Sequence, residues 1–198
     1  MFVASVSRPT LVLGGSQSRD VVDESRLGGV ALRRRKGGGG LVLLRPGDLW
    51  VDWWLPHDDV RWSPDVRVSS LLVGGWWAQA LRDLTSRDVV TYEGPLEGAT
   101  ALRVVCFAGR GPGEVFVAGR KAVGLTQWRV REGVFVSTVL HAEATSDVLE
   151  FLSEVPDGLA DALDHEALAT LRLGDPSGVV ATLHALSSPS RVRVVQLS

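Results

Sequence analysis

One long segment with helical spacing lies between two groups of strand-like segments. Apolar residues recur at the spacing of one helix face over 64–84, and Ser63-Pro64-Asp65 is a typical helix start. Residues typical of strands lie at 10–13, 30–34, 41–44, 49–55, 89–92, 102–108, 114–117, 120–131 and 133–140. This order predicts an α+β fold, in which α-helices flank a mixed, largely antiparallel β-sheet.

The remaining segments are mainly helical in pattern. We expect helices at 19–27, 146–152, 158–171 and 176–186, and a final strand at 191–197. The pair Gly74-Gly75 inside the long helix predicts close backbone packing there. No repeat or long linker divides the chain, so residues 1–198 are expected to form a single domain with a mainly helical tail at 140–198.

Composition excludes several classes of protein. With 198 residues and a net charge of -2, the chain has no general attraction for nucleic acid or membrane. A single cysteine, Cys106, cannot form an internal disulfide, and the four histidines show no metal-ligand spacing. The first eight residues do not resemble a signal peptide, so a cytoplasmic protein is expected by elimination. Six of the seven tryptophans cluster between residues 50 and 77, which favours a bulky core where a strand packs on a helix.

Four consecutive cations at residues 33–36 lead into four glycines at 37–40, and a strand follows. Glycine lets several backbone N–H groups approach a ligand, and arginine can hold phosphate or carboxylate with two hydrogen bonds. The segment therefore predicts an anion-binding loop. A basic nucleic-acid patch remains an alternative, although no second basic stripe occurs.

Two further segments carry reactive side chains. A turn at Gly119 between two strands places Arg120 or Lys121 at a sheet edge, and Gly124 leaves room on one face. Cys106 is expected at a strand end before a glycine-rich loop that contains Arg110, which favours a reactive thiol. The alternatives are an exposed hairpin lysine and a buried structural cysteine.

These segments occur in the order and spacing of one family. Residues 33–40 resemble the Arg-Arg-x-Ser-Gly-Gly-Gly-Ala signature of lipoate-protein ligases, and residues 119–127 are similar to the family hairpin Gly-Arg-Lys-Ile-x-Gly-Ser-Ala-Gln. The resemblance extends over about residues 11–139. It implies the catalytic domain of the biotin and lipoate protein ligases, a mixed sheet flanked by helices.

The resemblance implies an activity and a set of residues. Such a ligase uses ATP and Mg²⁺ to activate lipoate or octanoate as an acyl-adenylate and transfers the acyl group to a lysine of a lipoyl domain, of the 2-oxoacid dehydrogenase E2 or glycine cleavage H protein type. Lys121 would contact the acyl carbonyl and phosphate. The residues implied to bind substrate or nucleotide are Arg33, Arg34, Gly37, Gly38, Gly39, Gly40, Gly119, Arg120, Gly124 and Gln127.

Cys106-Phe107 supports a second hypothesis, because it is similar to the Cys-Phe pair of cysteine-dependent octanoyltransferases. Those enzymes need no ATP: a thiolate takes octanoate from acyl carrier protein and passes it to the lipoyl-domain lysine. A third hypothesis is a non-catalytic relative that binds an acyl ligand. It arises because Lys36, Leu43 and Trp128 replace the serine, histidine and arginine of the family pattern.

Overall fold

The structure is a computed structural model that describes residues 1–85, 87–142, 146–166 and 176–188. Its larger sheet is antiparallel throughout, and its strands lie in the order β1 (Phe2–Ser5), β5 (Leu49–Pro56), β9 (Gly133–Leu140), β8 (Arg120–Val130), β7 (Val115–Val117) and β6 (Val89–Thr91). The smaller sheet has the order β3 (Ala31–Arg34), β2 (Thr10–Leu13) and β4 (Val42–Leu44), with β2 parallel to β3 and antiparallel to β4. The predicted α+β class is confirmed, and the parallel pairing lies in a second sheet.

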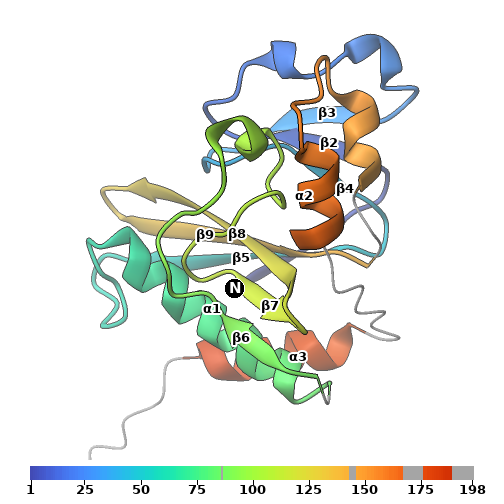
Figure 1. Cartoon of the computed structure of the whole chain (residues 1–198). Helices are drawn as coiled ribbons and strands as arrows, with labels where there is room; N and C mark the ends of the chain where they lie inside the picture. The colour runs from blue at the N-terminus through green and yellow to red at the C-terminus, as the bar shows by residue number, and fades with distance from the viewer. Residues whose placement is uncertain (86, 143–145, 167–175, 189–198) are drawn as a thin grey trace, which may run out of the picture.

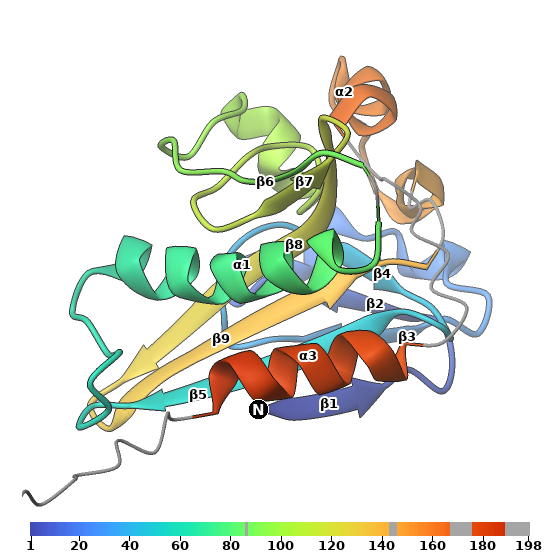
Figure 2. The ribbon, with the colours of Figure 1, turned by 90° about the horizontal axis from the view of Figure 1, so that it is seen from below.

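Two helices cover one face of the larger sheet (Figures 1 and 2). The helix α1 (Val66–Arg82) lies within the predicted range of 64–84, and the Asp65 carboxylate caps it by accepting a hydrogen bond from the Arg67 amide. The helix α3 (Ser177–Ser187) packs beside α1 on the same hydrophobic core. Among the described residues, no helix is long and apolar enough to cross a membrane.

Tryptophans fill this core, as the sequence predicted. Trp53 on β5 and Trp77 on α1 are buried, and their indole N–H groups both donate to the Thr138 hydroxyl, at 3.4 and 2.9 Å. The ring of Trp76 lies 5.0 Å from that of Trp53. Polar atoms of large aromatic residues need a partner when buried, and Thr138 supplies it for both.

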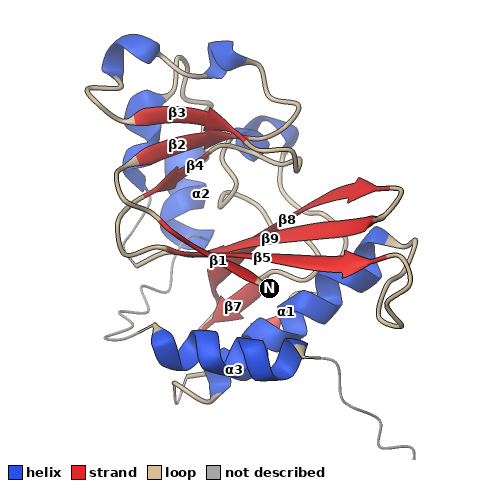
Figure 3. Ribbon diagram, turned by 180° about the vertical axis from the view of Figure 1, so that it is seen from behind, coloured by secondary structure: helices blue, strands red, loops and turns tan. Residues whose placement is uncertain are grey.

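A second core lies under the smaller sheet. It contains residues from β2 and β4 together with α2 (Leu159–Glu166), which begins near the start of the helix expected at 158–171. Figure 3 shows the smaller sheet lying over one end of the larger sheet, beyond which the hairpin of β8 and β9 extends.

The strand predicted at 102–108 is wrong. Residues Thr100–Val104 form a short 3-10 helix, and Val105 makes only an isolated parallel bridge with Leu41. Phe107 is fully buried against the second core. An apolar run this short has the same pattern in a strand and in a buried loop, so periodicity could not separate them.

Three other predictions need correction or fall outside the description. The helix predicted at 19–27 consists of two 3-10 turns, Arg19–Val21 and Glu24–Arg26, because the Asp23 side chain accepts from the Ser25 amide and caps the second turn. The helix predicted at 146–152 is also of the 3-10 type, Ser146–Phe151. The strand predicted at 191–197 lies outside the described residues.

Candidate active site

Five of the residues singled out by the sequence line one cavity of about 420 Å³: Gly38, Gly39, Gly40, Cys106 and Gln127. Its wall is built from the glycine run, the first turn of α1, the edge of β8 and the loop that contains Cys106. The strand β7 pairs with β8 only up to Val123, so the following residues of β8 are left as an edge along the cavity. The cavity therefore lies where the larger sheet has lost one strand pairing.

The glycine run packs tightly against backbone at Gly40, whereas Gly38 has open space around it. A Cβ atom on Gly40 would lie 2.4 Å from the Arg103 carbonyl oxygen and 2.8 Å from the Cys106 nitrogen. Gly39 has a φ of 87°, which favours glycine. The Thr126 hydroxyl donates to the Gly38 carbonyl at 2.8 Å and fixes the loop on β8. Within the described residues, the amides of Gly38 and Gly39 donate no hydrogen bond and are available to an anion in the cavity.

Lys121 is not the exposed hairpin lysine that the sequence left open. Its side chain is fully buried, and Nζ lies 2.7 Å from Oε2 of Glu114 and 3.1 Å from the Cys106 carbonyl oxygen. The ammonium also lies 5.3 Å from the centre of the Phe107 ring. Lys121 itself does not line the cavity, but both of the residues that its ammonium contacts, Glu114 and Cys106, do.

Glu114 is a site residue that the sequence reasoning missed. It lines the cavity, and its carboxylate accepts from the Gly111 amide at 2.7 Å as well as from Lys121. Burial raises the pKa of the Glu114 carboxyl, although Lys121 and the Gly111 amide lower it in part. The sequence feature that could have indicated Glu114 is an acid that directly precedes an apolar strand and is followed by a hairpin with two basic residues.

Cys106 is partly buried and lines the cavity, so the thiol lies with the glycine run as the second hypothesis requires. Its amide donates to the Leu41 carbonyl at 2.9 Å, which places it in a loop instead of at the end of a strand. Arg35 donates to the Gly40 carbonyl, and a Cβ on Gly40 would lie 2.8 Å from the Cys106 nitrogen, so Arg35 supports the part of the glycine run that packs on Cys106.

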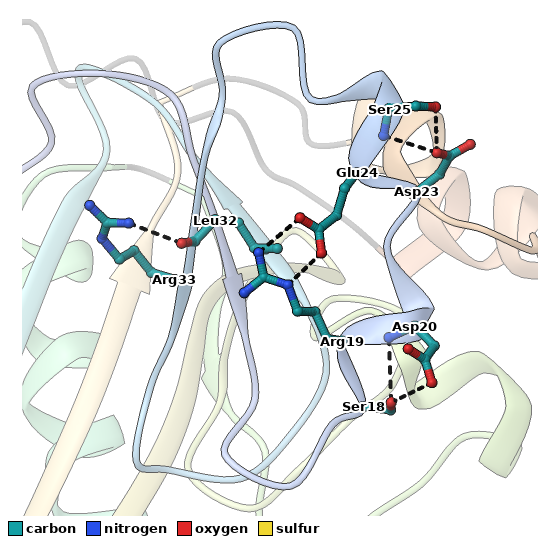
Figure 4. A network of polar contacts seen from close by, with 8 residues as sticks. All are labelled: Ser18, Arg19, Asp20, Asp23, Glu24, Ser25, Leu32 and Arg33. Atoms are coloured by element: carbon teal, nitrogen blue, oxygen red, sulfur yellow. Dashed lines mark hydrogen bonds and ion pairs between the residues drawn. The ribbon is translucent and has the colours of Figure 1, made fainter.

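The three arginines before the glycine run have different positions. Arg33 is exposed and donates only to the Leu32 carbonyl (Figure 4). Arg34 donates to the carbonyls of Gly14, Gly15 and Gln17. Neither lines the main cavity, where the resemblance had placed them.

Arg35, which the sequence reasoning did not select, supports the loop itself. Its guanidinium donates to the carbonyls of Gly38 and Gly40 at 2.7 and 2.8 Å. Burial lowers the pKa of this guanidinium. Strand alternation could have indicated that Arg35 differs from its neighbour, but not which of the two supports the glycine run.

Of the other residues predicted in the hairpin, some shape the fold and one lines the cavity. Gly119 forms the turn with a φ of 78°, and Arg120 donates to the Asp164 carbonyl, away from the cavity. Gly124 makes room for Phe107, because a Cβ there would lie 3.0 Å from that ring. Gln127 lines the cavity, and its amide nitrogen donates to the Val66 carbonyl at 2.6 Å.

Two sheets in this arrangement have the fold of the lipoate-protein ligase catalytic domain, as the sequence resemblance implied. A crystal structure of lipoate-protein ligase A bound with ATP matches with a TM-score of 0.69 and 19% identity, over 90% of this chain and 67% of that one. A putative lipoate protein ligase from T. acidophilum with bound lipoic acid matches with a TM-score of 0.67 and 18% identity, over 90% of this chain and 67% of that one.

A bipartite lipoate protein ligase from Thermoplasma acidophilum, described with its E2 lipoyl domain, matches with a TM-score of 0.66 and 18% identity, over 90% of this chain and 66% of that one. The chain therefore spans about two thirds of the length of these proteins. No family model and no curated protein sequence matches.

Proposed function

We propose that this chain is a lipoate-protein ligase-like enzyme, and that residues 1–198 form its single catalytic domain. The observation that carries the proposal is one cavity that unites the glycine run, Glu114 and Gln127 on the fold of such ligases. The substrates would be lipoate or octanoate, ATP and the lysine of a lipoyl domain.

The cavity suits an acyl chain with a polar end. Val66, Leu96, Val105 and Leu125 supply apolar surface, which favours burial of a hydrocarbon chain. The amides of Gly38 and Gly39 supply donors for an anionic head. A carboxylate would lie at the glycine run, with its chain along the apolar wall.

The cavity also carries groups suited to ATP and Mg²⁺. The amides of Gly38 and Gly39 would hold phosphate oxygens, and Arg103 also lines the space. Mg²⁺ is usually bound through one or two carboxylates together with substrate phosphates, and Glu97 and Glu114 line the cavity. Among the described residues, no cluster of three or more metal-ligating side chains occurs.

The reaction would proceed in two displacements. A carboxylate oxygen of the acid attacks the α-phosphorus of ATP, and pyrophosphate leaves. The amine of the lipoyl-domain lysine then attacks the acyl carbon, AMP leaves, and the amine loses a proton. Lys121 would stabilise charge on the carbonyl only after ligand binding separates it from Glu114, because its ammonium is closed off from the cavity in this structure.

One observation favours a second candidate, an octanoyltransferase without ATP. Cys106 lines the cavity beside the glycine run, so a thiol nucleophile would lie next to the amides of Gly38 and Gly39. The thiolate would attack the carbonyl of an octanoyl thioester on acyl carrier protein and release the carrier thiol. The lipoyl-domain amine would then attack the new thioester, release Cys106 as a thiol and form the amide.

Intact-mass spectrometry of a lipoyl domain separates the candidates. One mixture contains this protein, ATP, Mg²⁺ and lipoate or octanoate, and the other contains octanoyl-acyl carrier protein without ATP. An acyl mass gain in the first mixture alone, retained by Cys106→Ser, would establish the ligase. A gain in the second alone, lost in Cys106→Ser, would establish the transferase. No gain in either mixture would refute both and leave the non-catalytic relative.

A further inference from the structure

A second cavity of about 340 Å³ lies apart from the candidate active site. It is bounded by Ala4 on β1, by Val6, Ser7 and Arg8, and by all three strands of the smaller sheet. Four arginines contribute to its lining, Arg8, Arg33, Arg34 and Arg35, and none of its lining residues carries a carboxylate. We refer to it as the arginine groove.

The positive charge of the arginine groove is not neutralised by the protein. None of the four arginines forms an ion pair with a carboxylate in the described part of the chain. Three acids elsewhere already have partners: Glu24 pairs with Arg19 (Figure 4), Asp23 pairs with Arg26, and Asp52 accepts from the Trp50 indole. Like charges gathered at one cavity repel each other, so an external anion there would relieve the repulsion.

The donors of the groove are partly preorganised. Arg34 and Arg35 are held by backbone carbonyls, so little side-chain entropy remains to be lost when they bind a ligand. Arg33 uses a single nitrogen for the Leu32 carbonyl. In the described part of the chain no partner contacts the Arg8 guanidinium, although the Arg8 carbonyl accepts a hydrogen bond from the Thr10 hydroxyl. Each guanidinium has five N–H donors, so Arg8 and Arg33 retain nearly all of theirs.

The floor of the groove is apolar. Val12, Leu44 and Trp50 line it, and the Trp50 indole N–H is already satisfied by Asp52 at 2.9 Å. A ligand that carries only charge would leave this surface in contact with water. A ligand with a short hydrocarbon part would cover it, and the removal of apolar surface from water favours binding.

We propose that the arginine groove is a second ligand site, which binds an organic anion with a phosphate or carboxylate head and a short apolar tail. The head would lie against Arg8 and Arg33, and the tail would cover Val12 and Trp50. The proposal goes beyond the acyl-transfer function and does not depend on it, since binding here requires no turnover. Only Arg35 contributes to both sites, through its bonds to the glycine run.

Isothermal titration calorimetry tests the site with three probes: hexyl phosphate, hexanoate and inorganic phosphate. The test variant is Arg8→Ala with Arg33→Ala, both on exposed side chains, so the fold should survive. The matched control is Arg87→Ala with Arg131→Ala, two exposed arginines outside the groove. A third variant, Arg103→Ala, removes a cation that lines the main cavity.

We expect hexyl phosphate or hexanoate to bind the wild type, with at least about a 10-fold loss of affinity in the Arg8 and Arg33 variant. The matched control should bind as the wild type does, and Arg103→Ala should keep the binding event that the Arg8 and Arg33 variant loses. The stronger of the two organic probes identifies the head group. An affinity loss in Arg103→Ala alone, an equal loss in the matched control, or no binding of any probe would overturn the proposal. Equal affinity for inorganic phosphate and hexyl phosphate would overturn the apolar part of it.

Discussion

At the scale of single residues, the pair of Lys121 and Glu114 dominates the candidate active site. Both side chains are buried, and a charge buried without its partner costs far more than an exposed one. A lysine in this position therefore affects stability as well as chemistry. Loss of activity in a lysine variant is informative only when the folding of that variant is measured too.

Lys121→Ala should lower the free energy of unfolding by about 3–5 kcal/mol, because it leaves the Glu114 carboxylate buried without its partner. The folded-state pKa of Glu114 is already raised by burial and should rise further in this variant. A carboxyl with a raised folded-state pKa binds a proton more tightly in the folded state. The variant should therefore lose stability as pH rises from the ordinary glutamate pKa through the raised folded-state pKa. Urea unfolding followed by tryptophan fluorescence at several pH values measures both effects.

The matched control for that prediction removes both charges. Glu114→Leu combined with Lys121→Met replaces the ion pair by apolar side chains of similar size and should recover most of the lost stability. If the free energy of unfolding of Lys121→Ala lies within about 1 kcal/mol of the wild-type value, the pair behaves as a surface ion pair, and its buried geometry is contradicted.

A second buried pair, Asp48 and His141, ties the turn before β5 to the end of β9. Burial alone would raise the pKa of Asp48, but hydrogen bonds from His141 and from the amides of Ala142 and Arg45 outweigh it and hold the pKa below its ordinary value. The stabilisation is therefore present above the unfolded-state pKa and is lost as pH falls through the folded-state pKa.

Asp48→Asn should cost about 1–3 kcal/mol at neutral pH, because the amide cannot accept all of these hydrogen bonds. The difference in melting temperature from the wild type should shrink as pH falls below the ordinary aspartate pKa of about 4, because the unfolded state then binds a proton that the folded-state Asp48 carboxylate still resists. The exposed Asp58→Asn serves as control. A difference in melting temperature that stays constant from about pH 7 down through the range in which carboxyl groups titrate would show that the charge of Asp48 is not involved.

At the scale of elements, α1 carries adjacent glycines with opposite surroundings. A Cβ on Gly74 would lie 2.1 Å from the Gly113 carbonyl oxygen, whereas a Cβ on Gly75 would meet nothing within 4 Å. The helix therefore approaches the loop before β7 at Gly74 only. The close packing predicted for the pair is confirmed at one residue of the two.

Gly75→Ala should stabilise the protein by about 0.5–1 kcal/mol, which is the ordinary gain in helix propensity. Gly74→Ala should instead destabilise it by about 1–3 kcal/mol, because the methyl group has no room against the backbone. Thermal unfolding of the two variants side by side measures the contrast. Stabilisation by both substitutions would mean that α1 does not approach Gly113 in solution.

At the scale of the whole molecule, the candidate active site exists only where distant segments meet. The glycine run follows the smaller sheet, β8 belongs to the larger one, and the Cys106 loop contacts both. Gly40 is where the glycine run packs closely on the Cys106 loop. A substitution at Gly40 therefore tests the assembly of the cavity directly.

Gly40→Ala should separate the glycine run from the Cys106 loop, since the added methyl group would overlap backbone atoms there. We expect a loss of about 1–3 kcal/mol in stability and the loss of acyl transfer to a lipoyl domain. Gly178→Ala in α3 is the control, because a Cβ at Gly178 meets nothing within 4 Å and Gly178 does not line the cavity. Acyl transfer by Gly40→Ala at the wild-type rate would contradict this arrangement of the cavity.

The sequence by itself determined the α+β class, most strands, the central helix and the two segments that surround the cavity. Local patterns contain this information, because alternation, helical spacing, capping residues and glycine turns act over a few neighbouring residues. The same limitation explains the failure at 102–108, where a short apolar run has no period that separates a strand from a buried loop.

Only the tertiary structure decided what the site residues contact. Lys121 is buried because Glu114, seven positions earlier, faces it across the hairpin. Arg35, and not Arg34, supports the glycine run, and the arginines before it line a separate groove. Burial, ion pairing and the division of a basic run between two cavities depend on contacts between distant segments, and no local pattern contains them.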